Sequence, residues 1–202
     1  MKYPDFFDAV PGIRLRDPLA SFLGAAEDGI IDYHYLDAVK LAGHSCPTVA
    51  SAYWLTHQAL RALYGEDLPE RGAVRIDFAA GISDGVTGIV ANVVSMLTGA
   101  AGDGGFKGLA GRFERRHLLS FGADLPLEIR YTRLDGQGQI DAAANPGRVP
   151  ASPEMVLLMP RCISGMANAA EVQQFGLLWQ ERVRRILLDH GGDAEVFMLR
   201  LT

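Results

Sequence analysis

The chain has 202 residues, of which 49% are hydrophobic and 21% are charged, which suits one folded domain with a sizeable core and excludes disordered and fibrous classes. Its formal net charge of -5 and its interspersed charges argue against a nucleic-acid-binding protein. We expect a cytoplasmic protein, because the chain has only two cysteines and its start is unlike a secretory signal. We expect no membrane segment, because no run of about 20 apolar residues is present.

The first 30 residues are expected to form an N-terminal arm and helix. Asp17 and Pro18 are an N-cap followed by proline at the first helical position, and this helix should end near Asp28 and Gly29. A short helix over 35–41 should end at Gly43, which suits a left-handed cap. A long helix is predicted over 47–64, where apolar residues recur at helical spacing.

The middle of the chain alternates strand and helix signals. Strands are predicted over 73–78, 118–121, 127–131 and 139–142, and a buried helix over 84–97. A short helix should begin at Ser152 and Pro153, and Pro160 should end or kink it. This order predicts an α+β fold, in which long helices pack on a mixed β-sheet, as a single domain over 1–202.

The C-terminal region, 168–202, should form a helix and a closing strand over 195–201. Asn168 and Glu171 have the spacing of a capping box at the start of the helix. Apolar residues cover more than one face of this helix, so a second face must be buried by the closing strand and the N-terminal arm, or by a second copy of the chain. The apolar residues are Val172, Phe175, Leu177, Leu178, Trp179, Val183, Ile186 and Leu187.

The tetrapeptide His44-Ser45-Cys46-Pro47 carries the clearest chemistry. Pro47 suits the first turn of the long helix, which puts Cys46 at or beside its N-cap, where the helix dipole favours a negative charge. His44 is two residues away, and a His nitrogen with a Cys sulfur suits zinc and other late first-row metals. The alternative is that Cys46 only packs in the core, because free cysteines are among the most buried residues.

The glycine-rich stretch 99–111 lacks the spacing of known phosphate-binding loops, so we do not expect it to bind phosphate. It is expected to be a loop with unusual backbone geometry that closes over a small-molecule pocket, with the helix over 47–64 as the floor.

The sequence resembles the FmdE-like family, named for the E component of formylmethanofuran dehydrogenase, over roughly residues 30–190. The segment YLDAVKLAGHSCPTVASAYW resembles the family signature, in which Gly-His-x-Cys-Pro opens a long helix, and the stretches LTGAAGDGGFKGL and GMANAAEVQQFGLLWQERVRRIL are similar to its glycine loop and C-terminal helix. The resemblance implies an α+β fold with a mixed sheet, a homodimer, and a metal ion, most often zinc, held by His44 and Cys46. Gly81 occupies the position of a further cysteine that FmdE-type members have, and Asp84 matches the family's Asp.

A third ligand should complete the metal site, because soft sites rarely stop at one His and one Cys. Asp84 is the first choice, since it lies at a strand-to-helix junction and matches the family's Asp; Asp77, His117 and Cys162 are the alternatives. If Asp84 does not bind the metal itself, it would orient the His44 ring through the second ring nitrogen.

The sequence thus predicts a metal-binding protein, with zinc or another divalent transition metal at His44, Cys46 and Asp84 beside a small-molecule pocket. Its substrate, and whether it is an enzyme, are open. Two alternatives are a non-catalytic binding or scaffold module, and a metal-free thiol enzyme in which His44 deprotonates Cys46.

Overall fold

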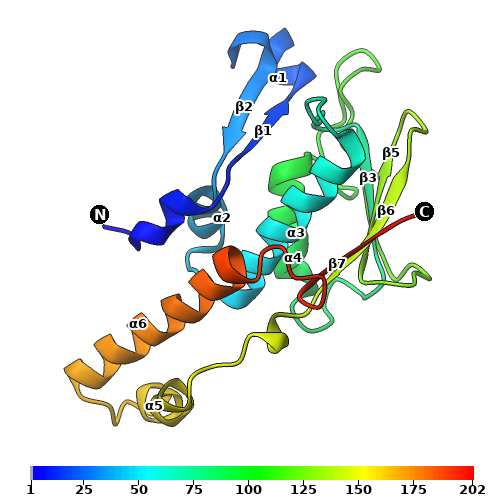
Figure 1. Ribbon diagram of the computed structural model, residues 1–202. Helices are drawn as coiled ribbons and strands as arrows, with labels where there is room; N and C mark the ends of the chain where they lie inside the picture. Colours follow the sequence, from blue (N-terminus) through cyan, green and yellow to red (C-terminus); the bar gives the residue numbers. More distant parts are fainter. Residues whose placement is uncertain (1) are drawn as a thin grey trace.

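The computed structural model describes residues 2–202, which form an α+β fold around a mixed sheet (Figure 1). The strand order is β4-β3-β5-β6-β7; β3 and β4 are parallel, and every other neighbouring pair is antiparallel. The strands are β3 (Val74–Phe78), β4 (Leu119–Phe121), β5 (Ile129–Arg133), β6 (Gln139–Ala144) and β7 (Phe197–Leu201).

One face of this sheet carries the core, because side chains alternate along each strand. In β3, Val74, Ile76 and Phe78 are buried, while Arg75 is exposed on the other face. That other face is polar, and Arg130 of β5 donates two hydrogen bonds to the Asp141 carboxylate of β6. The sheet therefore packs helices on one side only.

Helices α3 (Pro47–Tyr64) and α4 (Thr87–Thr98) pack against each other, and α3 also contacts β5, β6 and β7 (Figure 1). Helix α2 (Tyr35–Ala42) contacts both of them. The predicted helix over 47–64 is confirmed residue for residue. The helix predicted from residue 84 begins later, at Thr87, because residues 79–86 form the turns that connect it to β3.

The N-terminal arm is more structured than predicted. Two strands that the sequence analysis missed, β1 (Ile13–Arg16) and β2 (Ile30–Tyr33), pair in an antiparallel ribbon. Between them, α1 (Pro18–Phe22) begins at the predicted Asp17 cap but ends well before Asp28. The helix stops early because the chain turns at Gly24, which has a positive φ of 68°.

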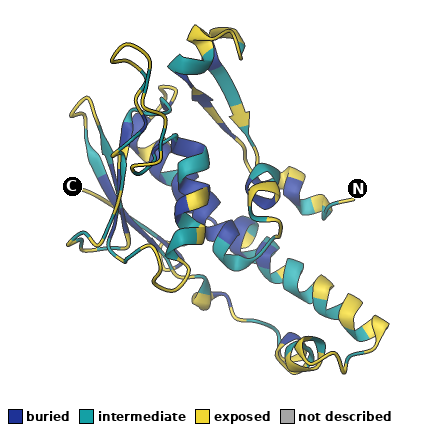
Figure 2. Cartoon of the chain, turned by 180° about the vertical axis from the view of Figure 1, so that it is seen from behind, coloured by how far each residue is buried: buried dark blue, intermediate teal, exposed yellow. Residues whose placement is uncertain are grey.

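Helices α5 (Pro153–Ile163) and α6 (Ala169–Arg184) pack on each other and extend away from the sheet (Figure 1). The Asn168–Glu171 capping box is present, as predicted. Pro160 was predicted to end or kink its helix. It does not end the helix, because α5 continues past Pro160 to Ile163. Figure 2 shows that much of the surface of this helix pair is exposed.

The predicted closing strand is confirmed as β7 at the edge of the sheet. None of the helices within residues 2–202 combines the length and the apolar character that crossing a bilayer requires.

Candidate functional site

The loop that joins α2 to α3 holds the His-x-Cys pair at the start of the long helix. Gly43 ends α2 in the left-handed conformation, with φ 77°, and its N–H donates to the Val39 carbonyl. Cys46 is the N-cap of α3, in extended conformation, and Pro47 is the first helical residue. The predicted position of Cys46 is therefore confirmed, and it follows from proline's preference for the first turn.

The His44 ring is exposed and has a defined orientation. Its Nδ1 lies 3.0 Å from the Ala42 carbonyl oxygen. Because a carbonyl oxygen only accepts, Nδ1 must carry the proton in this hydrogen bond, and in the neutral ring Nε2 then has the free lone pair. A backbone carbonyl on one ring nitrogen is the usual arrangement when the other nitrogen binds a metal.

The Cys46 side chain is half-buried and accepts a hydrogen bond. The Val49 N–H donates to Sγ at 3.5 Å, within the first turn of α3. An 18-residue helix begins here, and the positive end of its dipole favours negative charge on the sulfur. Sulfur in this position is suited to act as a thiolate ligand or nucleophile.

Ser45, between the two, fixes the loop to the rest of the molecule. Its hydroxyl lies 2.8 Å from the Tyr35 hydroxyl, and its carbonyl oxygen accepts from Trp179 Nε1 at 3.0 Å and Gln180 Nε2 at 3.2 Å. Burial raises the pKa of Tyr35 well above its ordinary value, although its hydrogen bond with Ser45 acts in the opposite direction. Helices α2 and α6 therefore both hold the loop, so its backbone is braced from two sides.

Among residues 2–202, no third ligand is grouped with this pair. Asp84 lies in the β3–α4 connection, as predicted, but it is exposed and its Oδ2 accepts the Gly81 N–H at 2.8 Å. Within residues 2–202 no group of three or more His, Cys, Asp or Glu side chains is placed to hold a metal ion. Asp84 therefore stays a predicted ligand.

Two of the alternative third ligands have partners of their own. Asp77 accepts from Ser120 Oγ at 2.7 Å and from Arg75 on the polar face of the sheet. His117 lies 3.1 Å from an Asp103 carboxylate oxygen. Neither set of contacts points to the His44–Cys46 pair.

The remaining alternative, Cys162, is half-buried on α5, which extends away from the sheet.

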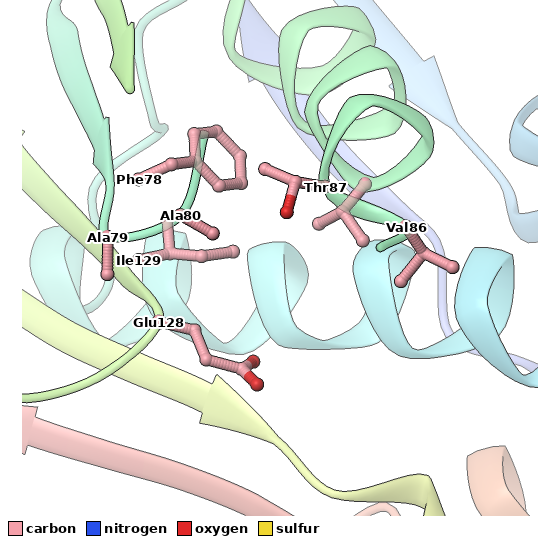
Figure 3. Close-up of a pocket in the computed structure, with 8 residues that line it drawn as sticks. Phe78, Ala79, Ala80, Val86, Thr87, Glu128 and Ile129 are labelled. Atoms are coloured by element: carbon pink, nitrogen blue, oxygen red, sulfur yellow. The ribbon is translucent and has the colours of Figure 1, made fainter. Parts of the chain in front are cut away.

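A cleft opens along α3 beyond the His-x-Cys loop. Thr48, Ser51, Ala52 and Leu55 of α3 line it, so this helix forms one of its walls. The opposite wall comes from Val86 and Val90 at the start of α4 and from the first residues of β5, and Figure 3 shows this side.

The glycine-rich stretch 99–111 was expected to close over the pocket, but none of its residues lines this cleft. The stretch 99–111 begins at the far end of α4, and residues after it line a separate hollow with Pro18, Arg71 and Gly72. Its backbone geometry is unusual, as predicted, because Gly99, Gly108, Ala110 and Gly111 all have positive φ.

Sequence reasoning also missed Glu128, whose carboxylate faces the cleft (Figure 3). A single acidic residue before a strand gives no signal in the sequence, because its position depends on how β5 meets α4.

The sequence matches no family model, and it matches no curated protein.

Proposed function

We propose that the chain is an FmdE-like metal-binding protein that holds zinc or a similar divalent transition-metal ion through His44 Nε2 and Cys46 Sγ. One observation carries this proposal: Nδ1–H of His44 donates a hydrogen bond to the Ala42 carbonyl, which leaves Nε2 free two residues before a cysteine at a helix N-terminus. The donor set suits the metal, since imidazole nitrogen and thiolate sulfur are preferred zinc ligands.

Two protein ligands leave coordination positions for water, for a small molecule or for a group from elsewhere. Sites with open positions bind or activate ligands, whereas structural zinc sites are closed by four protein ligands. The bound metal would supply Lewis acidity there. The braced backbone of Ser45 would keep both ligands in place during ligand exchange.

Metal content tests the proposal directly. The protein is purified without added ions, and metal per chain is measured for the parent, for His44→Ala, for Cys46→Ser and for the double variant. Each single variant should lose most of the metal and the double variant all of it. Full metal retention in the double variant would overturn the proposal.

A matched control separates this site from adventitious binding. His190→Ala removes a histidine elsewhere in the chain and should keep the parent metal content, whereas Cys162→Ser tests an alternative third ligand. Asp84→Ala is added to the series; if Asp84 is the third ligand, this variant also loses affinity, by about tenfold or more.

The helix start also supports a second candidate, a metal-free thiol enzyme in which His44 deprotonates Cys46. This candidate predicts fast alkylation of Cys46 at a mildly acidic pH of about 6, with a rate that a chelator does not change. A metal-bound thiolate is instead protected until the chelator is added. A chelator should therefore accelerate alkylation if the thiolate binds a metal, and should leave the rate unchanged in the metal-free enzyme.

We also propose that the protein is a cytoplasmic homodimer. Both cysteines are free thiols, which suits a reducing compartment. Exposed apolar side chains gather on the helix pair α5–α6, at positions that a second copy could cover. They are Val156, Leu157, Ile163, Met166, Val172 and Leu177.

A further inference from the structure

Two adjoining pockets form one cleft between α3, α4 and the ends of β5 and β6, which we call the α3–α4 cleft. They have volumes of about 140 Å³ and 110 Å³ and share Val86, Val90, Glu128 and Ile129. A cavity of about 150 Å³ accommodates a benzene ring, so each pocket has room for one ring or a short alkyl chain.

The walls of the cleft are largely apolar. The apolar side chains come from the sheet, from α3 and from α4, so the cleft is built by elements that the core already holds in place. The largest of them are Leu55, Phe78, Val86, Val90 and Ile129.

One carboxylate faces these walls. Glu128 Oε2 accepts the Ala144 N–H at 3.2 Å, and its side chain extends toward the space beneath Val86 and Thr87 (Figure 3). No arginine or lysine lines either pocket, and across residues 2–202 Glu128 is in no ion pair. The start of α4 contributes about half a positive charge, which is less than the full charge of Glu128.

A buried hydroxyl lines the same cleft without a partner. Ser51 is only 5% exposed, and its Oγ makes no hydrogen bond to any described residue. Buried polar groups are normally hydrogen-bonded, and an unsatisfied one costs free energy. A ligand in the cleft that offers a donor or an acceptor would remove this cost.

From these features we infer that the α3–α4 cleft binds a small organic cation, an amine on an apolar body about the size of one ring. The ammonium group lies against Glu128 and the apolar body packs between Phe78, Val90 and Ile129. The hydroxyls of Ser51 and Thr87 accept its remaining hydrogen bonds. The inference does not depend on a metal at His44 and Cys46, because none of these groups belongs to that pair.

Three probes with similar bodies and different charges test this specificity. Chelator-treated protein is titrated at about pH 7 with 2-phenylethylamine, 2-phenylethanol and 3-phenylpropanoate, and binding is followed by calorimetry and by amide chemical shifts. Glu128 is exposed, and exposed ion pairs are weak, so the amine should bind about two- to fivefold more tightly than the alcohol. The carboxylate should bind more weakly than both.

Glu128→Gln keeps the size of the side chain and an oxygen that can accept the Ala144 N–H, so the variant should fold. It should lose the preference for the amine, whereas Glu154→Gln, which removes an exposed acid on α5, should keep it. Ser51→Ala should weaken amine binding while leaving the unfolding temperature unchanged or higher, because the buried hydroxyl has no partner to lose.

The inference would be overturned if the alcohol or the carboxylate bound as tightly as the amine, or if Glu128→Gln kept the preference for the amine. It would also be overturned if the amine changed the amide chemical shifts only of residues outside the cleft. Because the titration uses metal-free protein, these failures are distinguishable from failure of the proposed metal site.

Discussion

Asp17 connects three parts of the chain through one side chain. Its Oδ1 accepts the N–H groups of Leu19 and Ala20 at the start of α1, and its carboxylate pairs with Arg71 and with Arg115 at 2.7 Å. Both Asp17 and Arg115 are buried. Burial alone would raise the pKa of Asp17, but the charges of Arg115 and Arg71, with the hydrogen bonds, lower it below its ordinary value.

We expect Asp17→Asn to lower the free energy of unfolding at pH 7 by about 3 kcal/mol. Asparagine still caps the helix, but the variant leaves Arg71 and the buried Arg115 without their negative partner, and breaking a buried pair is costly. Urea unfolding of the parent and of the variant measures the difference. A loss within about 0.5 kcal/mol would contradict the role of Asp17.

The same pair of proteins gives a pH prediction. Because the folded-state pKa of Asp17 is lowered, its contribution is complete above the unfolded value of about 3.9 and is lost as the pH falls through the folded value. The stability difference between the parent and Asp17→Asn should therefore be constant from about pH 7 to 5 and shrink below about pH 4. A difference that instead grows on acidification would refute this assignment.

At the scale of an element, Gly43 determines how α2 connects to the His-x-Cys loop. Its φ of 77° lies in the left-handed region, and a Cβ built there would meet no described atom within 4 Å. Any cost of a side chain at this position must therefore come from backbone conformation and not from crowding.

Gly43→Ala should destabilise the fold by about 1–2 kcal/mol, the cost of the left-handed conformation for an L-residue with a Cβ. Gly176→Ala in the exposed middle of α6 is the matched control: a Cβ there is equally free of contacts, but the position is helical. That variant should gain up to about 1 kcal/mol from helix propensity. Equal effects of the two substitutions in thermal unfolding would contradict the conformational argument.

Sequence patterns predicted long elements better than short ones. The apolar spacing over 47–64, opened by Pro47 and placed after Cys46, predicted both ends of α3. The alternation of Ile13 to Arg16 was too short to indicate β1, whose partner β2 lies beyond α1. Short strands depend on a distant partner that local sequence does not reveal.

The candidate site was predictable only where it is local. His44 and Cys46 lie on one loop, so their placement followed from the helix start. The bonds from Trp179 and Gln180 to Ser45 join residues more than 130 positions apart, and nothing in either segment indicates them. The same holds for Glu128, which lines the same pocket as Val86 only because of tertiary packing.

At the scale of the whole molecule, the helix pair α5–α6 extends away from the rest of the chain and has much exposed surface (Figure 2). The sequence predicted that the C-terminal helix must bury a second apolar face. Val183 is buried, and so are Ile186 and Leu187 in the π-helical turn that follows, whereas Val172 and Leu177 toward the outer end are exposed. The closing strand therefore does not cover the outer half of α6.

We expect Leu177→Glu to convert the proposed homodimer to a monomer without loss of monomer stability, because a charge at the centre of an apolar interface is costly to bury. Leu23→Glu is the matched control, since Leu177 and Leu23 are 62% and 61% exposed and Leu23 lies on the N-terminal arm. Sedimentation at micromolar concentration distinguishes the two. A parent protein that sediments as a single monomer would contradict the dimer.

Cobalt spectroscopy reports directly on whether His44 and Cys46 bind a metal ion. Co²⁺ is added to chelator-treated protein, because it occupies zinc sites and absorbs in the near ultraviolet when a thiolate binds it. We expect a thiolate-to-cobalt band that saturates at a single ion per chain and is displaced by Zn²⁺. This band should be absent in Cys46→Ser and weakened in His44→Ala. An unchanged band in Cys46→Ser, or no band in the parent, would contradict this expectation.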